Sequence, residues 1–420
     1  MRKLPKYLAT RFSFFYGWTI LFCSCCAGFA RQGPAVATLS LFVTPMTTEF
    51  EWSRTAISGA VSIGGILAAI ISPLLGPFVD KHGSRTMLCF AVLTTALCCI
   101  LLSFTSSLLI FYILFCLARM NFAGPFDLGI YGAVNNWFVR RRPLAISIVT
   151  LTQMAGLTSM PLIAYGAMTI DGWRAGWIAI GLVVFLIGFF PTFLFMVRKP
   201  EDLNLQPDAN EHTINIKNSD LNKNEPTFTR SQAIKTSSFW LLLVFTAMVY
   251  PVQAGISLHQ APNLLEQGIA PSTAAFVVST FSLVSGLSAL VYGFTVRRLG
   301  VRTNLFFAAI SLGTGCVLML SIKTVLVAYL ASIFFGIGIG GILCVLPIIW
   351  ADYFGRSNFA SIRGIVLTVQ ISAQAAGPVI SGALRDWSET YELSLLLFAG
   401  MSILAAIISV VVRPPNPPLY

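Results

Sequence analysis

Twelve apolar runs, each 20 or more residues long, follow one another along the chain and constrain its fold more than any other feature. A lipid core about 30 Å thick is crossed by roughly 20 residues of α-helix. Only 10% of the residues are charged, against roughly 25% in soluble proteins. We therefore predict an all-α membrane protein and exclude a soluble globular enzyme. The runs lie at about 15–44, 54–79, 86–105, 108–134, 143–169, 175–197, 238–264, 272–296, 303–322, 325–350, 360–384 and 391–412.

One long polar stretch separates the first six runs from the last six. Residues 198–235 hold six Lys or Arg and six Asp or Glu, together with many Asn, Thr and Ser. Such a composition cannot bury enough apolar surface to fold by itself. We predict an N-terminal six-helix bundle over residues 1–197, a linker over 198–237 and a C-terminal six-helix bundle over 238–420.

The basic residues are distributed as in a membrane protein with a fixed orientation. The formal charge is +11, yet it is not gathered on one soluble face, so nucleic acid is not an expected partner. With the N-terminus placed in the cytoplasm, 21 of the 27 Lys and Arg fall on cytoplasmic segments and four on outer ones. Residues 1–11 are basic, but no cleavage pattern follows the first run. We predict a multi-pass plasma-membrane protein with both termini in the cytoplasm.

Neither the cysteines nor the histidines form a pattern typical of a catalytic or metal site. All nine Cys lie within apolar runs without metal-ligand spacing, and the chain has only three His. No nucleotide-binding loop or Ser/His/Asp arrangement is present in the sequence. We therefore expect no enzyme activity, no metal and no cofactor.

The two halves repeat each other. Two short matches, each placed similarly within its half, recur at an offset of 216 or 217 residues. A parallel repeat of two six-helix halves is typical of secondary transporters, whose substrate site lies between the halves near the middle of the bilayer. The matches pair Gly76, Val79, Lys81, Gly83 and Arg85 with Gly293, Val296, Arg298, Gly300 and Arg302, and Phe138, Arg140, Ile146, Gln153, Pro161 and Ile163 with Phe354, Arg356, Ile362, Gln370, Pro378 and Ile380.

The stretch from Gly76 to Arg85 resembles the loop signature of the major facilitator superfamily, G-x-x-x-D-[RK]-x-G-x-[RK]. Three other motifs look like its monocarboxylate and oxalate/formate transporter branch: Tyr16-Gly17-Trp18, Asn136-Trp137-Phe138 before the arginines 140–142, and Tyr353-Phe354-Gly355-Arg356. The resemblance covers the whole chain. It implies the major facilitator fold, with two pseudo-symmetric six-helix bundles that rock around a central site.

The signature loop suggests a gate. Asp80 can accept hydrogen bonds from the amides at a helix N-terminus and pair with an arginine, while the two glycines permit close packing and a tight turn. The resemblance implies that its partners are the start of the eleventh span, near Arg363, and Arg140. The alternative is a solvated loop that follows the charge bias. The predicted gating residues are Gly76, Asp80, Gly83, Arg85, Arg140 and Arg363.

Polar residues inside the spans locate the substrate site. Buried ionisable groups in a bilayer are costly and usually functional. Arg31 and Arg119 both lie near mid-membrane, and a guanidinium binds a carboxylate through two parallel hydrogen bonds. For Arg119 a structural role, bound to helix carbonyls or to Asp127, remains an alternative. The predicted substrate-binding residues are Arg31, Gln32, Arg119, Asn121, Gln153, Tyr250, Gln253, Gln370 and Gln374.

Two titratable residues are candidates for coupling to protons. Asp127 lies in the fourth span, where low dielectric favours the protonated carboxyl group. His259 lies near the outer end of the seventh span, and its alternative role is that of a hydrogen-bonded structural group.

These observations favour a secondary active transporter for a small organic anion, a mono- or dicarboxylate, coupled to protons or working by exchange. The chain departs from this branch at the charged residues expected to bind the substrate. Its eighth span and the interior of its eleventh span carry no cation, although members of the branch have charged residues in these spans. Only the charged residue of the first span has a counterpart in this chain, which is Arg31. The alternative function is proton-driven efflux of a drug-like compound or a metallophore. The expected partners are the anion, the lipid bilayer and protons, and the chain is expected to be a monomer.

Overall fold

The computed structural model of the 420-residue chain describes residue 7, residues 14–208 and residues 226–416. These residues are helical, with no strand among them. Ten of their helices are long and apolar enough to cross a membrane. The number agrees with the twelve predicted spans, because the first span is divided into two shorter helices and the fifth and sixth spans are continuous in one stretch, Arg142–Phe195.

The first half of the chain folds into helices α2 to α9. Within α8 the residues Asp171 and Gly172 leave the helical conformation, which separates the fifth span from the sixth. The sixth span continues through a π-helical segment, Val184–Phe189. The helices are α2 (Gly17–Ala30), α3 (Val36–Phe50), α4 (Arg54–His82), α5 (Ser84–Leu102), α6 (Leu108–Ala123), α7 (Pro125–Trp137), α8 (Arg142–Val183) and α9 (Phe190–Phe195).

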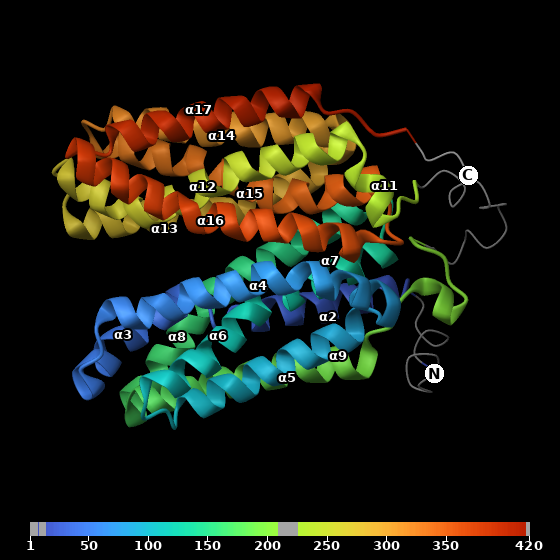
Figure 1. Cartoon of the computed structure of the whole chain (residues 1–420), viewed down its shortest axis with the longest axis horizontal. Coiled ribbons are helices and arrows are strands. Elements are labelled where there is room, and N and C mark those ends of the chain that lie inside the picture. Colours follow the sequence, from blue (N-terminus) through green and yellow to red (C-terminus); the bar gives the residue numbers. More distant parts are fainter. Residues whose placement is uncertain (1–6, 8–13, 209–225, 417–420) are drawn as a thin grey trace. The chain divides into compact units, whose positions relative to one another are not determined.

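The second half forms longer, uninterrupted helices, among which α17 runs alongside α14 (Figure 1). The prolines inside α12, α15 and α16 leave each of them continuous. Of the predicted linker, residues 209–225 lie outside the described part, and the rest contains two short helical turns, η2 (Pro200–Leu203) and α11 (Arg230–Ile234). The spans are α12 (Ser237–Glu266), α13 (Pro271–Leu299), α14 (Val301–Leu320), α15 (Val325–Phe354), α16 (Phe359–Ser388) and α17 (Glu392–Val411).

The chain divides into two compact units. Unit 1 comprises residues 1–145, 152–227 and 354–368, so it includes the start of α16, and unit 2 comprises residues 146–151, 228–353 and 369–420. In unit 2, α15 packs closely on its neighbours through a glycine run. A Cβ atom at Gly340 would lie 2.3 Å from the Ser285 carbonyl oxygen of α13, and one at Gly338 would lie 2.6 Å from Leu312 of α14. Small residues allow such close contact between membrane helices.

Large apolar side chains are exposed along α5 and α17. Examples are Phe90 and Leu97 on α5, and Leu396, Ile403 and Ile407 on α17. A soluble protein would cover such rows, whereas a bilayer solvates them. The exterior therefore matches the fold class expected from composition, that of a multi-pass membrane protein.

Candidate functional site

The first membrane span is broken at its middle, which corrects the continuous run predicted over residues 15–44. Helix α2 ends at Ala30, four residues form turns, and α3 begins at Val36. The Gly33-Pro34 pair explains the break, because proline has no N–H to donate and glycine adopts non-helical conformations at little cost. Arg31 lies at the end of α2, where its own N–H still donates to the Ala27 carbonyl over 2.8 Å.

The fourth span is broken as well, which corrects the continuous run predicted over 108–134. Gly124 has φ −108° and ψ −81°, and Pro125 begins the next helix, α7. Asp127 therefore lies in the first turn of a helix, where the N–H groups and the helix dipole favour a negative charge. The two breaks bring helix ends, rather than helix middles, to the charged residues of unit 1.

Asp127 is the centre of a buried ion-pair cluster. Its side chain is 4% exposed and accepts a hydrogen bond from Arg363 Nε over 3.2 Å, while Arg31 Nη1 lies 3.7 Å from its other carboxylate oxygen. Arg363 had been expected at the terminus of a span as a gating residue, but it is buried beside Asp127. The structure thus joins a predicted gating residue to the predicted substrate site.

Arg119 does not pair with Asp127. Its Cζ lies 4.2 Å from the centre of the Phe122 ring, and Arg31 Cζ lies 4.6 Å from the same ring. Nε and Nη1 of Arg119 are buried and have no hydrogen-bond partner among the described residues, and the same holds for Nε of Arg31. The structural role considered for Arg119, bound to helix carbonyls or Asp127, accounts for neither of these two nitrogens.

The cluster carries excess positive charge. Arg31, Arg119 and Arg363 contribute three guanidinium groups, and Asp127 contributes one carboxylate. Like charges held in low dielectric repel strongly, and an anion between them relieves that repulsion. The arrangement can therefore bind a carboxylate through N–H groups that the protein leaves unpaired.

The predicted side-chain amides of Gln32 and Gln153 lie where α2 packs against α8. Gln153 packs on Gly28, where a Cβ atom would lie 3.1 Å from its Cγ, and Gln32 packs in the same way on Gly156. The Nε2 atom of Gln153 is buried without a hydrogen-bond partner in the described part of the chain. Gln32 directly follows Arg31, so both amides belong to the same region of unit 1.

Asn121 binds the neighbouring helix α5, and its predicted contact with substrate stays a prediction. Its Nδ2 donates to the hydroxyls of Thr94, over 2.7 Å, and Thr95, over 3.2 Å, both on α5. The side chain is fully buried between helices. Asn121 therefore joins the fourth span to the third instead of lying with the arginines.

In unit 2, two of the predicted amides bind each other. Gln374 Nε2 on α16 donates to Gln253 Oε1 on α12 over 2.9 Å. Gln370, one turn before Gln374, is 8% exposed, and its Oε1 is buried without a partner among the described residues. Tyr250 is 2% exposed on the same helix as Gln253.

His259 is held by two hydrogen bonds that favour its structural interpretation. Its Nε2 lies 3.2 Å from the carbonyl oxygen of Pro378, and its Nδ1 lies 3.2 Å from the hydroxyl of Tyr391. A neutral imidazole with one N–H satisfies both partners, as donor to the carbonyl and acceptor from the hydroxyl. Proton coupling at His259 stays a prediction.

Asp80 caps the start of α16. Its carboxylate accepts hydrogen bonds from the backbone N–H of Ala360, over 3.1 Å, and of Ser361, over 2.8 Å, and also from the Ser361 hydroxyl. Gly76 makes the contact possible, because a Cβ atom there would lie 2.4 Å from the Ala360 carbonyl oxygen. The expected contact between the signature loop and the start of the eleventh span is therefore present, and the gating role stays a prediction.

The arginine beside Asp80 is Arg198, not Arg140 as expected. Arg198 Nη2 donates to the Asp80 backbone carbonyl over 2.9 Å, and its stem packs on Gly83, which has φ +87°. Arg140 is exposed, and its backbone N–H donates to the carboxylate of Asp208. Arg85 binds α9, where its Nη2 donates to the carbonyl oxygen of Phe193 over 2.8 Å.

Sequence reasoning missed Phe122, Arg198 and the pairing of Arg363 with Asp127. The Gly-Pro pairs at 33–34 and 124–125 were the available signal for the two helix breaks. No comparable signal announces Phe122, since an aromatic residue in an apolar span is ordinary.

Comparisons with known proteins identify the family. The family model of the Major Facilitator Superfamily matches residues 20–262 and 255–419. Human monocarboxylate transporter 2 is 22% identical over 93% of this chain and 84% of its own length, and rat monocarboxylate transporter 1 is 22% identical over 92% and 85%.

Solved structures show the same fold. The proton:xylose symporter XylE has a TM-score of 0.75 at 15% identity, covering 93% of this chain and 94% of its own. The human organic anion transporter MFSD10 has a TM-score of 0.72 at 14% identity, covering 94% and 99%. The chain belongs to the Major Facilitator Superfamily of membrane transporters and, within it, resembles the monocarboxylate transporters.

Proposed function

We propose that the chain is a secondary active transporter that moves a small organic anion, a mono- or dicarboxylate, by alternating access. The observation that carries the proposal is the pair Arg31 and Arg119, which share the Phe122 ring and retain buried N–H groups without partners. The monocarboxylate transporters among the relatives support the same substrate class.

The geometry suggests how a carboxylate binds. Nε and one Nη of a guanidinium lie on the same edge and donate two parallel hydrogen bonds to the two oxygens of a carboxylate. Nε and Nη1 of Arg119 are both buried and free of protein partners in the described structure, so this guanidinium has N–H groups available to a ligand. Phe122 contacts both guanidinium groups, and Asp127 pairs with Arg31 from the other helix of the broken fourth span.

Transport of labelled lactate, formate and oxalate into proteoliposomes tests the proposal. We expect Arg119→Gln to lower carboxylate uptake about 100-fold, because losing one partner of a buried charged pair costs roughly 2–5 kcal/mol. Arg119→Lys keeps the charge but loses the fork, so it should recover only part of the activity. Arg174→Gln is the matched control, since this exposed arginine pairs with Glu49 away from the cluster. Uptake that is unchanged in both Arg119 variants would refute the site.

Arg31→Gln gives a second, independent test. It should abolish anion binding while the chain still folds and inserts into the membrane. Absence of uptake or exchange of every carboxylate by the unaltered chain would contradict the substrate class itself. Drug sensitivity of a deletion strain would then favour efflux instead.

Coupling is part of the proposal and has its own measurement. Asp127 contacts two arginines of the cluster, whereas His259 is bound by Pro378 and Tyr391, so Asp127 is the better placed proton carrier. Uptake driven by an imposed pH gradient in empty vesicles identifies proton coupling. Uptake that requires carboxylate inside the vesicle identifies exchange.

We also propose that Asp80 and the start of α16 form the gate on the cytoplasmic side of a plasma-membrane carrier. The charge bias of the loops supports this orientation. Protease cleavage of tags added at the two termini, in sealed right-side-out vesicles, tests it. Both tags should be cleaved only after the membrane is permeabilised.

A further inference from the structure

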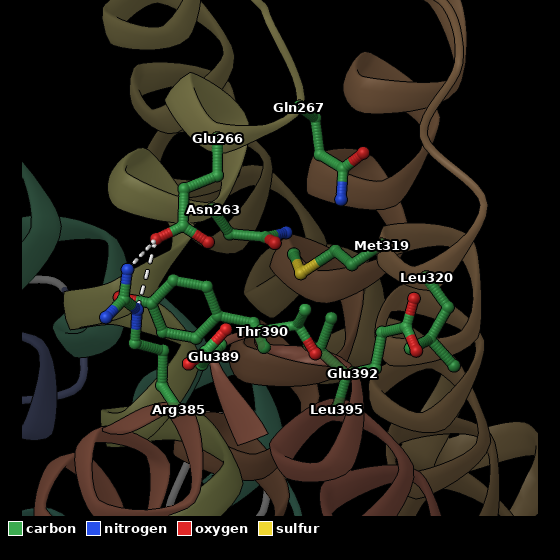
Figure 2. Close-up of a pocket in the computed structure, with 11 residues that line it drawn as sticks. Asn263, Glu266, Gln267, Met319, Leu320, Arg385, Glu389, Thr390, Glu392 and Leu395 are labelled. Atoms are coloured by element: carbon green, nitrogen blue, oxygen red, sulfur yellow. Dashed lines mark hydrogen bonds and ion pairs between the residues drawn. The ribbon is translucent and has the colours of Figure 1, made fainter. Parts of the chain in front are cut away.

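Unit 2 contains a pocket that the proposed transport function does not use. It has a volume of about 350 Å³ and lies where α12 and α14 end, α16 ends and α17 begins (Figure 2). This volume is in the range of small-molecule sites. None of Arg31, Arg119, Asp127, Gln253 or Gln374 lines it.

The pocket has an excess of negative charge. Glu266, Glu389 and Glu392 line it, against one cation, Arg385, which is bound to Glu266 over 3.1 Å. Glu389 and Glu392 form no ion pair with the described residues. The Tyr391 hydroxyl, which lies 3.2 Å from His259 Nδ1, adds a neutral polar group to this wall of the pocket. An anion such as a carboxylate is repelled here, whereas a cation is attracted.

A buried, unpaired amide faces the pocket. Asn263 is 4% exposed, and its Nδ2 has no hydrogen-bond partner among the described residues. Figure 2 shows its amide directed from α12 into the space beside Gln267 and Met319. A buried amide N–H without a partner has lost its hydrogen bonds to water without replacing them. A ligand with an oxygen acceptor replaces one of them.

Part of the lining is apolar, which suits a ligand with a carbon body better than a bare metal ion. Met319, Leu320 and Leu395 form an apolar side of the pocket. No group of three or more His, Cys, Asp or Glu close enough to hold a metal exists in the described part of the chain. The carboxylates therefore surround the space at its edges, as suits an extended organic cation, and do not converge on one point.

We propose that this pocket binds a small organic cation that carries an ammonium group, a hydroxyl or carbonyl oxygen and a short apolar body. The excess negative charge at the edges of the pocket attracts the ammonium, the oxygen accepts from Asn263, and the apolar body lies on Met319 and Leu395. The inference goes beyond the transport function proposed above and does not depend on it.

Four compounds of matched size test the proposal by calorimetry on the full chain in lipid nanodiscs. Phenylethanolamine has all three features, phenylethanediol replaces its ammonium with a hydroxyl, mandelate replaces it with a carboxylate, and phenethylamine lacks the hydroxyl. We expect phenylethanolamine to bind at least tenfold more tightly than phenylethanediol, and about threefold more tightly than phenethylamine. Equal binding of phenylethanolamine and phenylethanediol, or no binding of either at millimolar concentration, overturns the proposal.

Variants locate the binding. Glu392→Gln should weaken phenylethanolamine binding about fivefold, and Asn263→Ala should abolish its advantage over phenethylamine. Asp386→Asn is the matched control, because this carboxylate is 81% exposed and does not line the pocket. An equal loss in Glu392→Gln and Asp386→Asn would assign the affinity to general surface charge and refute the site. Arg119→Gln should leave the affinity unchanged, which separates this pocket from the transport site.

Discussion

The two halves of the chain agree in their scaffold and differ in their charges. Arg85 donates to the Phe193 carbonyl, and exactly the same contact recurs 217 residues later between Arg302 and the Val410 carbonyl. Gly83 and Gly300 end their helices with φ of 87° and 80°. At the other end of the spans, Glu49 pairs with Arg174, and its counterpart Glu266 pairs with Arg385.

The interior does not follow this repeat. At the same offset of 217, Arg31, Arg119 and Asp127 correspond to Met248, Gly336 and Cys344. Asp80, which caps α16, corresponds to the exposed Arg297. The contacts that position helices are thus kept in both halves, whereas Arg31, Arg119 and Asp127 have no charged counterpart in the second. The comparison teaches that the repeat is a framework on which the first half supplies most of the charged groups of the cluster, joined by Arg363 from the second.

The largest effect is expected from Asp127→Asn. The change leaves Arg31 and Arg363 buried without their carboxylate, which costs roughly 3–5 kcal/mol when one partner of a buried ion pair is removed. Cys344→Ala, at the corresponding position of the second half, should cost only about 1 kcal/mol. Thermal unfolding of the two variants in detergent measures the difference. Similar losses in both would show that the charge asymmetry has no energetic basis.

A smaller effect is expected at the signature loops. Asp80→Asn weakens three hydrogen bonds to the start of α16, so we expect turnover to slow about tenfold with little change in equilibrium anion binding. Arg297→Gln, the same position in the second loop, should leave turnover within about twofold. Initial rates and binding isotherms in the same vesicles separate the two quantities. A slow Arg297→Gln variant would contradict the confinement of the gate to the first loop.

The two loop glycines should respond alike, with a modest difference. Both have positive φ, where an alanine costs about 1–2 kcal/mol. Gly83→Ala must also displace the Arg198 stem, whereas a Cβ atom at Gly300 meets nothing within 4 Å. We expect Gly83→Ala to lower the melting temperature more than Gly300→Ala. The reverse order would indicate that Arg198 moves aside without cost.

The smallest effect concerns pH. Hydrogen bonds from Arg174 and Trp173 lower the pKa of the Glu49 carboxyl below its ordinary value. Because the pKa of Glu49 in the folded chain lies below its unfolded value of about 4.3, the pair stabilises the fold fully above about pH 4.3. This stabilisation is lost as the pH falls through the folded pKa. Melting temperatures at a series of acidic pH values should therefore fall slightly less steeply for Glu49→Gln than for the unaltered chain. Parallel curves would show that the pair contributes nothing measurable.

Much of the fold follows from the sequence for clear physical reasons. Apolar runs of bilayer length mark the spans because a membrane tolerates few unpaired polar groups. The signature loop resembled a known motif, and the predicted contact between Asp80 and the start of the eleventh span is present. The paired amides Gln253 and Gln374 also lie together, in keeping with their selection as intramembrane polar groups.

The details of the cluster could not be read from spacing alone. Asp127 was placed eight residues after Arg119 on one helix, but the break at Gly124 changes the direction of the chain between them. Arg363 lies only four residues after the start of α16, a position that predicts a residue at the membrane surface rather than a buried one. Its burial depends on α4 and α7 packing around it, and such tertiary contacts leave no mark in a hydropathy pattern.

The start of α16 is bound by two carboxylates within four residues: Asp80 at Ala360 and Ser361, and Asp127 at Arg363. A ligand that competes with Asp127 for Arg31 or Arg363 therefore changes the stability of the first turn of α16, which Asp80 also binds. Thermodynamic linkage makes this relation reciprocal. Formation of the Asp80 contact alters anion affinity by some factor, and anion binding must alter the equilibrium of that contact by the same factor. A measurement of either factor therefore gives the other.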